Sequence, residues 1–91
     1  MTSVVENRTI LVVDDEKINR QQMISVFSEE YIILEAENGF IALEILNSMK
    51  VDAVLLDLDM PGMNGLQFLD VVSDDKELEK IPIIVVADSI N

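Results

Sequence analysis

Two short apolar runs that each end on aspartate constrain the fold of this chain most strongly. Residues 10–13 lead into Asp14 and Asp15, and residues 54–56 lead into Asp57. An unbroken apolar run of this length predicts a strand buried on both faces of a parallel sheet. Ligand sites gather at the carboxyl ends of neighbouring parallel strands, so the pattern predicts three carboxylates in one crevice. Carboxylates crowded in this way repel one another unless a cation neutralises them.

The order of segments along the chain predicts the rest of the architecture. Residues 1–8 are polar and predict a leader, so the domain spans residues 9–91. Strand patterns cover residues 9–13, 31–36, 51–56 and 83–86, and helical patterns cover residues 16–28, 38–49 and 65–73. Asn38 offers an N-cap for the second helix, and Pro82 opens the last strand after a polar link over residues 74–80. This alternation predicts right-handed crossovers, a parallel sheet and helices on both faces.

Helical spacing predicts which side chains face the sheet. The expected core positions are Asn19, Met23, Val26 and Phe27 in the first helix, Ala42, Ile45, Leu46 and Met49 in the second, and Phe68, Leu69 and Val72 in the third. Lys17, Arg20 and Gln21 are expected on the outer face of the first helix.

Length, composition and charge narrow the classes of protein. The 91 residues allow one small domain, and an apolar fraction of 49% argues against disorder. The 18 acids and 6 bases give a formal charge of -12, which repels nucleic acid phosphates and anionic lipid surfaces. No apolar run is long enough to span a bilayer. We therefore expect a soluble cytoplasmic protein with no nucleic acid partner and no membrane partner.

Three motifs resemble the receiver domain of two-component response regulators. They are Ile-Leu-Val-Val-Asp-Asp-Glu at residues 10–16, Ala-Glu-Asn-Gly at residues 36–39 followed by Ala42 and Leu43, and Leu-Leu-Asp-Leu-Asp-Met-Pro-Gly-Met-Asn-Gly at residues 55–65. The resemblance covers Thr9 to about Val86 and implies a flavodoxin-like, doubly wound α/β fold. The parallel sheet is expected in the strand order 2-1-3-4, with the family's fifth strand and last two helices absent from this sequence.

The resemblance implies that Asp57 accepts a phosphoryl group from a sensor histidine kinase or a phosphotransfer protein. Mg2+ (or Mn2+) would be held by the side chains of Asp15 and Asp57 and by the main-chain carbonyl of Asp59, with Asp14 acting through a bound water. Such a cation offsets the charge on the phosphoryl oxygens during transfer. The chain would then be a signalling module and not an enzyme, with self-phosphorylation and self-dephosphorylation at most.

Structural interpretations of the single acids stay open beside the functional one. Asp14 or Asp15 alone could cap a helix, and Asp57 alone could be a turn residue. Their joint occurrence at two strand ends favours the site. The side chain of Asp59 is expected to point to solvent beside it.

The loop that follows the second run carries turn-forming residues. Pro61 and Gly65 are expected to shape this loop. Met60 and Met63 are expected to pack within it and not to recognise a partner.

The end of the fourth strand departs from the family pattern. Ala87 stands at the switch position where the family has Ser or Thr, and Asp88 follows it. Ser89 could supply the hydroxyl only if the strand end were bulged. The lysine that the family carries after strand five has no counterpart in this sequence. The two differences remove a hydrogen-bond donor and a cation from the expected site.

An apolar sheet edge is expected at the fourth strand. Without a fifth strand, Ile83, Ile84, Val85 and Val86 would present unpaired backbone groups, a surface prone to pair with another chain. We therefore expect a homodimer joined through this strand or by exchange of elements.

Three functions are compatible with these features. The first is a receiver-type phosphoacceptor. The second is a non-phosphorylated interaction module that binds a partner through the fourth-strand edge, which Ala87 and the missing lysine favour. The third is a metal-dependent phosphatase or hydrolase, because Asp57 and Asp59 have the spacing of a nucleophile and a general acid. The Asp14-Asp15 pair and the small size favour the receiver over the hydrolase.

Overall fold

A four-stranded parallel sheet forms the centre of the structure. The computed structural model describes residues 7–86. The strands are β1 (Arg8–Val13), β2 (Tyr31–Ala36), β3 (Ala53–Asp57) and β4 (Ile83–Val86), and they lie in the order β2-β1-β3-β4. Each neighbouring pair is parallel. The predicted α/β class and strand order are confirmed.

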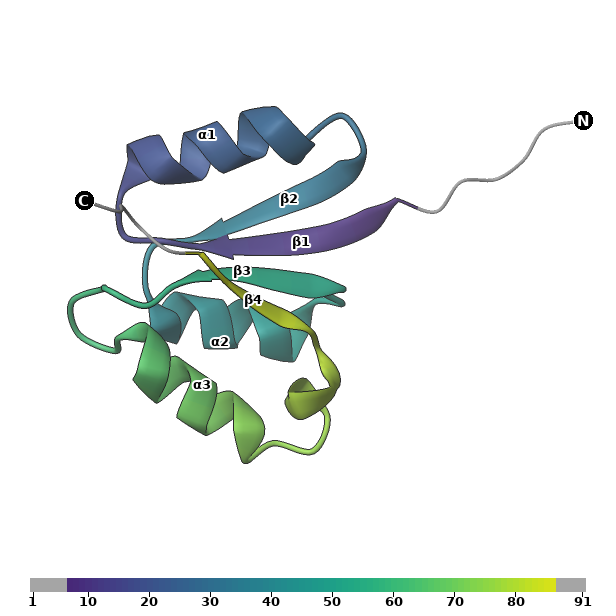
Figure 1. Ribbon diagram of the computed structural model, residues 1–91. Coiled ribbons are helices and arrows are strands. Elements are labelled where there is room, and N and C mark those ends of the chain that lie inside the picture. Colours follow the sequence, from purple (N-terminus) through teal and green to yellow (C-terminus); the bar gives the residue numbers. More distant parts are fainter. Residues whose placement is uncertain (1–6, 87–91) are drawn as a thin grey trace, which may run out of the picture.

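Helices cover both faces of this sheet. The helix α1 (Lys17–Phe27) lies on one face, and α2 (Gly39–Ser48) and α3 (Gly65–Ser73) lie on the other (Figure 1). A short 3-10 helix, η1 (Leu78–Lys80), precedes β4. None of the helices in residues 7–86 is both long and apolar enough to cross a membrane.

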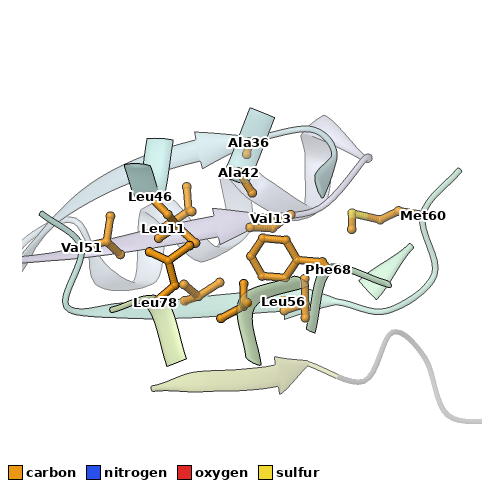
Figure 2. Close-up of a cluster of buried hydrophobic side chains, with 12 residues drawn as sticks. Leu11, Val13, Ala36, Ala42, Leu46, Val51, Leu56, Met60, Phe68 and Leu78 are labelled. Carbon is orange, nitrogen blue, oxygen red and sulfur yellow. The ribbon is translucent and has the colours of Figure 1, made fainter. Parts of the chain in front are cut away.

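The strand side chains alternate between two apolar clusters. Leu11 and Val13 of β1 pack into the larger cluster, whereas Ile10 and Val12 belong to a second cluster that also contacts the side chains of α1. The larger cluster contains Phe68 of α3, which is fully buried against the sheet (Figure 2). Because both faces of β1 are covered, its sequence is an unbroken apolar run, as predicted.

Side-chain caps define where two of the helices begin. The Asn38 side chain accepts a hydrogen bond from the Ile41 backbone N–H at 2.8 Å, which confirms the predicted N-cap of α2. Asn64 and Gln67 form a capping box at α3, in which each side chain accepts a hydrogen bond from the other residue's backbone N–H at 2.9 Å. These bonds satisfy N–H groups that a helix start otherwise leaves unpaired, so α3 begins at a defined point after the loop.

The predicted placements of Val26, of Met49 and of the link over residues 74–80 are wrong. Val26 is 67% exposed, because Met23 and Phe27 take the face of α1 that packs on the sheet and Val26 lies beside that face. Met49 is 52% exposed, because α2 ends one residue earlier and Met49 itself has an extended backbone. The predicted polar link contains η1, and Leu78 within it is buried in the larger cluster.

The element boundaries differ from the predicted ones by one or two residues. β1 begins at Arg8, so the last residue of the predicted leader belongs to the sheet. β3 begins at Ala53, two residues later than predicted, and it includes Asp57. α1 is one residue shorter than predicted at each end.

Gly65 begins α3 directly against the end of β3. A Cβ atom added at Gly65 would lie 2.5 Å from Leu58 Cα and 2.9 Å from the main-chain oxygen of Asp57. The Gly65 N–H also donates a hydrogen bond to Leu58 O at 3.0 Å. A larger residue at this position would therefore displace the backbone that carries Asp57.

We expect Gly65→Ala to destabilise the fold by about 1–3 kcal/mol, because the added methyl group meets backbone atoms that cannot move independently. Gly39→Ala is the matched control, since Gly39 is likewise the first residue of a helix and its added Cβ meets the flexible Met63 side chain at 2.7 Å. The control should cost less than about 1 kcal/mol, because that side chain can shift. Urea unfolding of both variants measures their free energies of unfolding. Equal losses of stability would contradict the conclusion that the backbone contact at Gly65 excludes a side chain.

Candidate functional site

The carboxyl ends of β1 and β3 bring three aspartates together. Val13 and Leu56 are partners in the parallel pairing of these two strands. Asp14 directly follows β1, Asp15 follows Asp14, and Asp57 is the last residue of β3. One ligand oxygen from each aspartate lies within 4.8 Å of the others. The structure thus assembles the predicted group of three carboxylates, which we call the aspartate cluster.

Asp14 is fixed by hydrogen bonds to the end of β2 and to the N-cap residue of α1. The residue is buried, with 3% exposure. The Asp14 backbone N–H donates to Ala36 O at the end of β2 (3.1 Å), and Asp14 Oδ1 accepts from the Glu16 backbone N–H (2.9 Å). A carboxylate that accepts a backbone N–H at the start of a helix is favourably placed relative to the helix dipole.

Asp57 is held at the end of the buried strand. Its residue exposure is 7%, and Asp57 Oδ1 accepts a hydrogen bond from the Asp59 backbone N–H at 3.1 Å. Beyond it, Met60 is buried in the larger cluster and Met63 packs against that cluster, as expected of the two methionines. Pro61 is exposed, and Gly62 has a positive φ of 73°, so the chain turns sharply at this point.

Asp15 and Asp59 are both exposed, but only Asp15 belongs to the aspartate cluster. The Asp59 side chain lies outside that group among the described residues, and its backbone N–H turns inward to Asp57. The hydrolase interpretation needs the Asp59 carboxylate beside the nucleophile. The geometry therefore does not favour it.

Arg20 contacts the aspartate cluster, which sequence reasoning missed. It was expected on the outer face of α1, yet its side chain is only 12% exposed. Arg20 Nη1 donates to the main-chain oxygen of Asp14 at 2.7 Å, and Nε pairs with Glu35 Oε1 at 2.9 Å. Helical spacing describes where Cα atoms face, and a long arginine side chain can reach back past the end of its helix to the strand ends.

The donor set of the aspartate cluster fits a hard divalent cation. Carboxylate and carbonyl oxygens are the ligands that Mg2+ and Mn2+ prefer, and Mg2+ usually takes only one or two carboxylates and keeps several waters. Three acids within 4.8 Å of one another also create a negative potential that attracts a cation. Ala87, Asp88 and Ser89 lie outside the described residues, so the expectation for the switch position stays a prediction.

Comparisons with known proteins agree with this geometry. The family model described as "Response regulator receiver domain" matches residues 10–91. The nitrate/nitrite response regulator protein NarL of Escherichia coli (strain K12) is 44% identical over 68 residues, which cover 71% of this chain and 32% of NarL. The chain thus spans about a third of the length of that relative.

Two solved structures share the fold over most of the chain. A response regulator receiver protein from Pseudomonas putida superposes with a TM-score of 0.86 at 26% identity, covering 97% of this chain and 74% of that one. The response regulator protein TrrA from Thermotoga maritima, in complex with Mg2+-BeF, superposes with a TM-score of 0.80 at 38% identity, covering 88% and 69%.

The strand order, the aspartate cluster at the carboxyl ends of β1 and β3, and the family match over nearly the whole chain lead to one assignment. This chain belongs to the response regulator receiver domain family, the signalling modules of two-component systems.

Proposed function

We propose that Asp57 is the phosphoacceptor of this receiver. A carboxylate oxygen of Asp57 forms a bond to phosphorus, and the P–N bond of a phosphohistidine breaks. The electron pair of that bond stays on the imidazole nitrogen, which a proton neutralises. The product is an acyl phosphate on Asp57. The convergence of Asp57 with Asp14 and Asp15 within 4.8 Å is the observation that carries this proposal.

The geometry around Asp57 suits an acceptor. The hydrogen bond from the Asp59 backbone N–H orients the Asp57 carboxylate without neutralising it. The residue stands at the carboxyl end of a buried strand, where a ligand approaches from the crevice outside the sheet. Phosphoryl transfer demands mainly positioning and electrostatic stabilisation, and a fixed carboxylate meets the first demand.

We further propose that Mg2+ (or Mn2+) is held by the side chains of Asp15 and Asp57 and by the main-chain carbonyl of Asp59, with Asp14 acting through a bound water. The cation would neutralise charge on the transferred phosphoryl oxygens. The complex of TrrA with Mg2+-BeF supports this, since TrrA is 38% identical to this chain. Pro61 and Gly65 would fix the conformation of the loop that connects β3 to α3.

The protein that donates the phosphoryl group would be a sensor histidine kinase or a histidine phosphotransfer protein. Both provide the phosphohistidine that the proposed reaction consumes. Because the kinase needs ATP to make that group, we place the reaction in the cytoplasm. Alanine has no hydroxyl, so Ala87 at the predicted switch position would donate no side-chain hydrogen bond to a phosphoryl oxygen.

We also propose that the 91-residue chain associates with a second copy through β4. Among the described strands, β4 and β2 are the two edges of the sheet. Ile84 and Val85 of β4 are 54% and 46% exposed, so an edge with free backbone groups coincides with apolar side chains. The formal charge of -12 on each copy opposes this pairing.

Incubation with acetyl phosphate and Mg2+ should add one phosphoryl group to the chain. Intact mass spectrometry detects this gain. Asp57→Asn should abolish it, because the amide has nearly the same shape and is not a nucleophile. Asp59→Asn is the matched control and should still be labelled, since the Asp59 side chain lies outside the aspartate cluster. An unlabelled wild-type chain, shown to be folded by circular dichroism, would contradict the proposal.

Removal of the divalent cation should slow labelling by roughly 100-fold, because the cation contributes several kcal/mol of charge stabilisation. The test compares initial labelling rates in EDTA with rates after Mg2+ or Mn2+ is restored. Both ions should recover the rate, as both accept an oxygen ligand set. A rate that is the same in EDTA would rule out a role for the cation.

Self-association should increase with ionic strength. Salt shortens the screening length from about 30 Å at 0.01 M to about 8 Å at 0.15 M, which weakens the repulsion between two acidic chains. Light scattering should therefore report a larger mass at the higher salt concentration. Ile84→Lys should prevent the increase, while Val26→Lys on the exposed side of α1 should not. A monomer at high protein concentration in both salts would refute the β4 contact.

A further inference from the structure

We propose that Arg20 is a positioning residue that holds the turn between Asp14 and Asp15 in the geometry that binds a divalent cation. The inference rests on the proposed function of the aspartate cluster as a cation site. It assigns a role to a side chain that lies on α1 and contributes no ligand.

Arg20 connects α1 to the ends of two strands. Nη1 donates to Asp14 O at 2.7 Å, just beyond β1, and Nε donates to Glu35 Oε1 at 2.9 Å, on β2. The side chain is 12% exposed, so the guanidinium is largely removed from water. A hydrogen bond from a charged donor with little competing solvent is stronger than one between neutral groups.

The Arg20 contact completes the hydrogen bonding of the Asp14 backbone. The Asp14 backbone N–H is bound by Ala36 O, and the Asp14 carboxylate is bound by the Glu16 N–H. Arg20 binds the remaining main-chain group, the carbonyl. Because that carbonyl shares a peptide plane with the Asp15 N–H, fixing its oxygen fixes the orientation in which the chain enters Asp15.

Asp15 depends on this backbone support more than the other two aspartates do. It is exposed, and within residues 7–86 its side chain forms no hydrogen bond or ion pair. Repulsion from Asp14 and Asp57, within 4.8 Å, drives the Asp15 carboxylate outward toward water. A rigid turn opposes that movement. Arg20 makes the turn rigid through its hydrogen bond to Asp14 O, without being a ligand of the cation itself.

Three possible roles of Arg20 predict different changes in Mg2+ affinity when the side chain is removed. If Arg20 acted only through its charge, its removal would strengthen cation binding, because a guanidinium repels Mg2+. If it positions the turn, removal weakens binding, as loss of outer-shell partners typically does by about 10-fold or more. If it only stabilises the fold, the affinity of the folded variant does not change.

The experiment is a Mg2+ titration followed by 15N-1H NMR, which measures the dissociation constant from the backbone amide shifts of Asp14, Asp15 and Asp57. We expect Arg20→Met to bind Mg2+ about 10-fold more weakly than the wild type. Methionine keeps the apolar stem of the side chain and removes the donors. The Asp15 amide resonance should also move in the absence of metal, since the turn is released.

Arg8→Met is the matched control. Arg8 is exposed at the opposite end of β1, so the same substitution changes the net charge equally without touching the turn. It should leave the dissociation constant within about twofold of the wild type, because an exposed charge at that distance is screened. Arg20→Lys keeps the charge and a single donor nitrogen, but it cannot bond Asp14 and Glu35 in the planar geometry of arginine. We expect it to recover only part of the affinity.

Unchanged or tighter Mg2+ binding by folded Arg20→Met would overturn the inference. If that variant does not fold, Arg20→Lys decides, because binding equal to the wild type would also overturn it. Failure of the wild type itself to bind Mg2+ would instead refute the proposed cation site. Loss of affinity in Arg20→Met with normal affinity in Arg8→Met supports the positioning role.

Discussion

The in-register parallel pairing of β1 with β3 is the constraint on which the site depends. Val13 lies beside Leu56, so the residues that follow them leave the sheet at the same edge. A slip of one residue would exchange the faces of β3 and move Leu55 out of the smaller cluster. Side chains of β1 and β3 pack into one apolar cluster on each face of the sheet, so the packing on both faces fixes the register. The aspartates lie close together as a consequence of this core packing.

The same packing must support an unfavourable arrangement of charges. Asp14 and Asp57 are buried and lie within 4.8 Å of each other, which costs electrostatic free energy when both are ionised. Backbone N–H donors of Glu16 and Asp59 reduce this cost by binding one oxygen of each carboxylate. A divalent cation bound between the carboxylates would offset the remaining repulsion.

The sequence predicts the strands and the aspartate cluster because both depend on short apolar runs and their neighbours. The N-cap at Asn38 is also predictable from the sequence, since its hydrogen bond joins residues only three positions apart. The errors arise where tertiary contacts decide. Leu78 is one apolar residue in a polar segment, and only the turn made by Asp75, whose side chain accepts hydrogen bonds from two following N–H groups, brings it to the core.

Arg20 marks the limit of helical periodicity more clearly. Its Cα position on α1 predicts exposure, but the contacts of its side chain lie 6 and 15 residues away, at the ends of two strands. No period in the sequence encodes a side chain that bends over the end of its own helix. The supports of the site therefore differ in kind. Asp57 lies between the core and a capped helix, whereas Asp15 lies on an exposed turn that Arg20 contacts from α1. Of the three clustered aspartates, Asp14 and Asp57 are therefore buried and hydrogen-bonded, and Asp15 is the one that faces water.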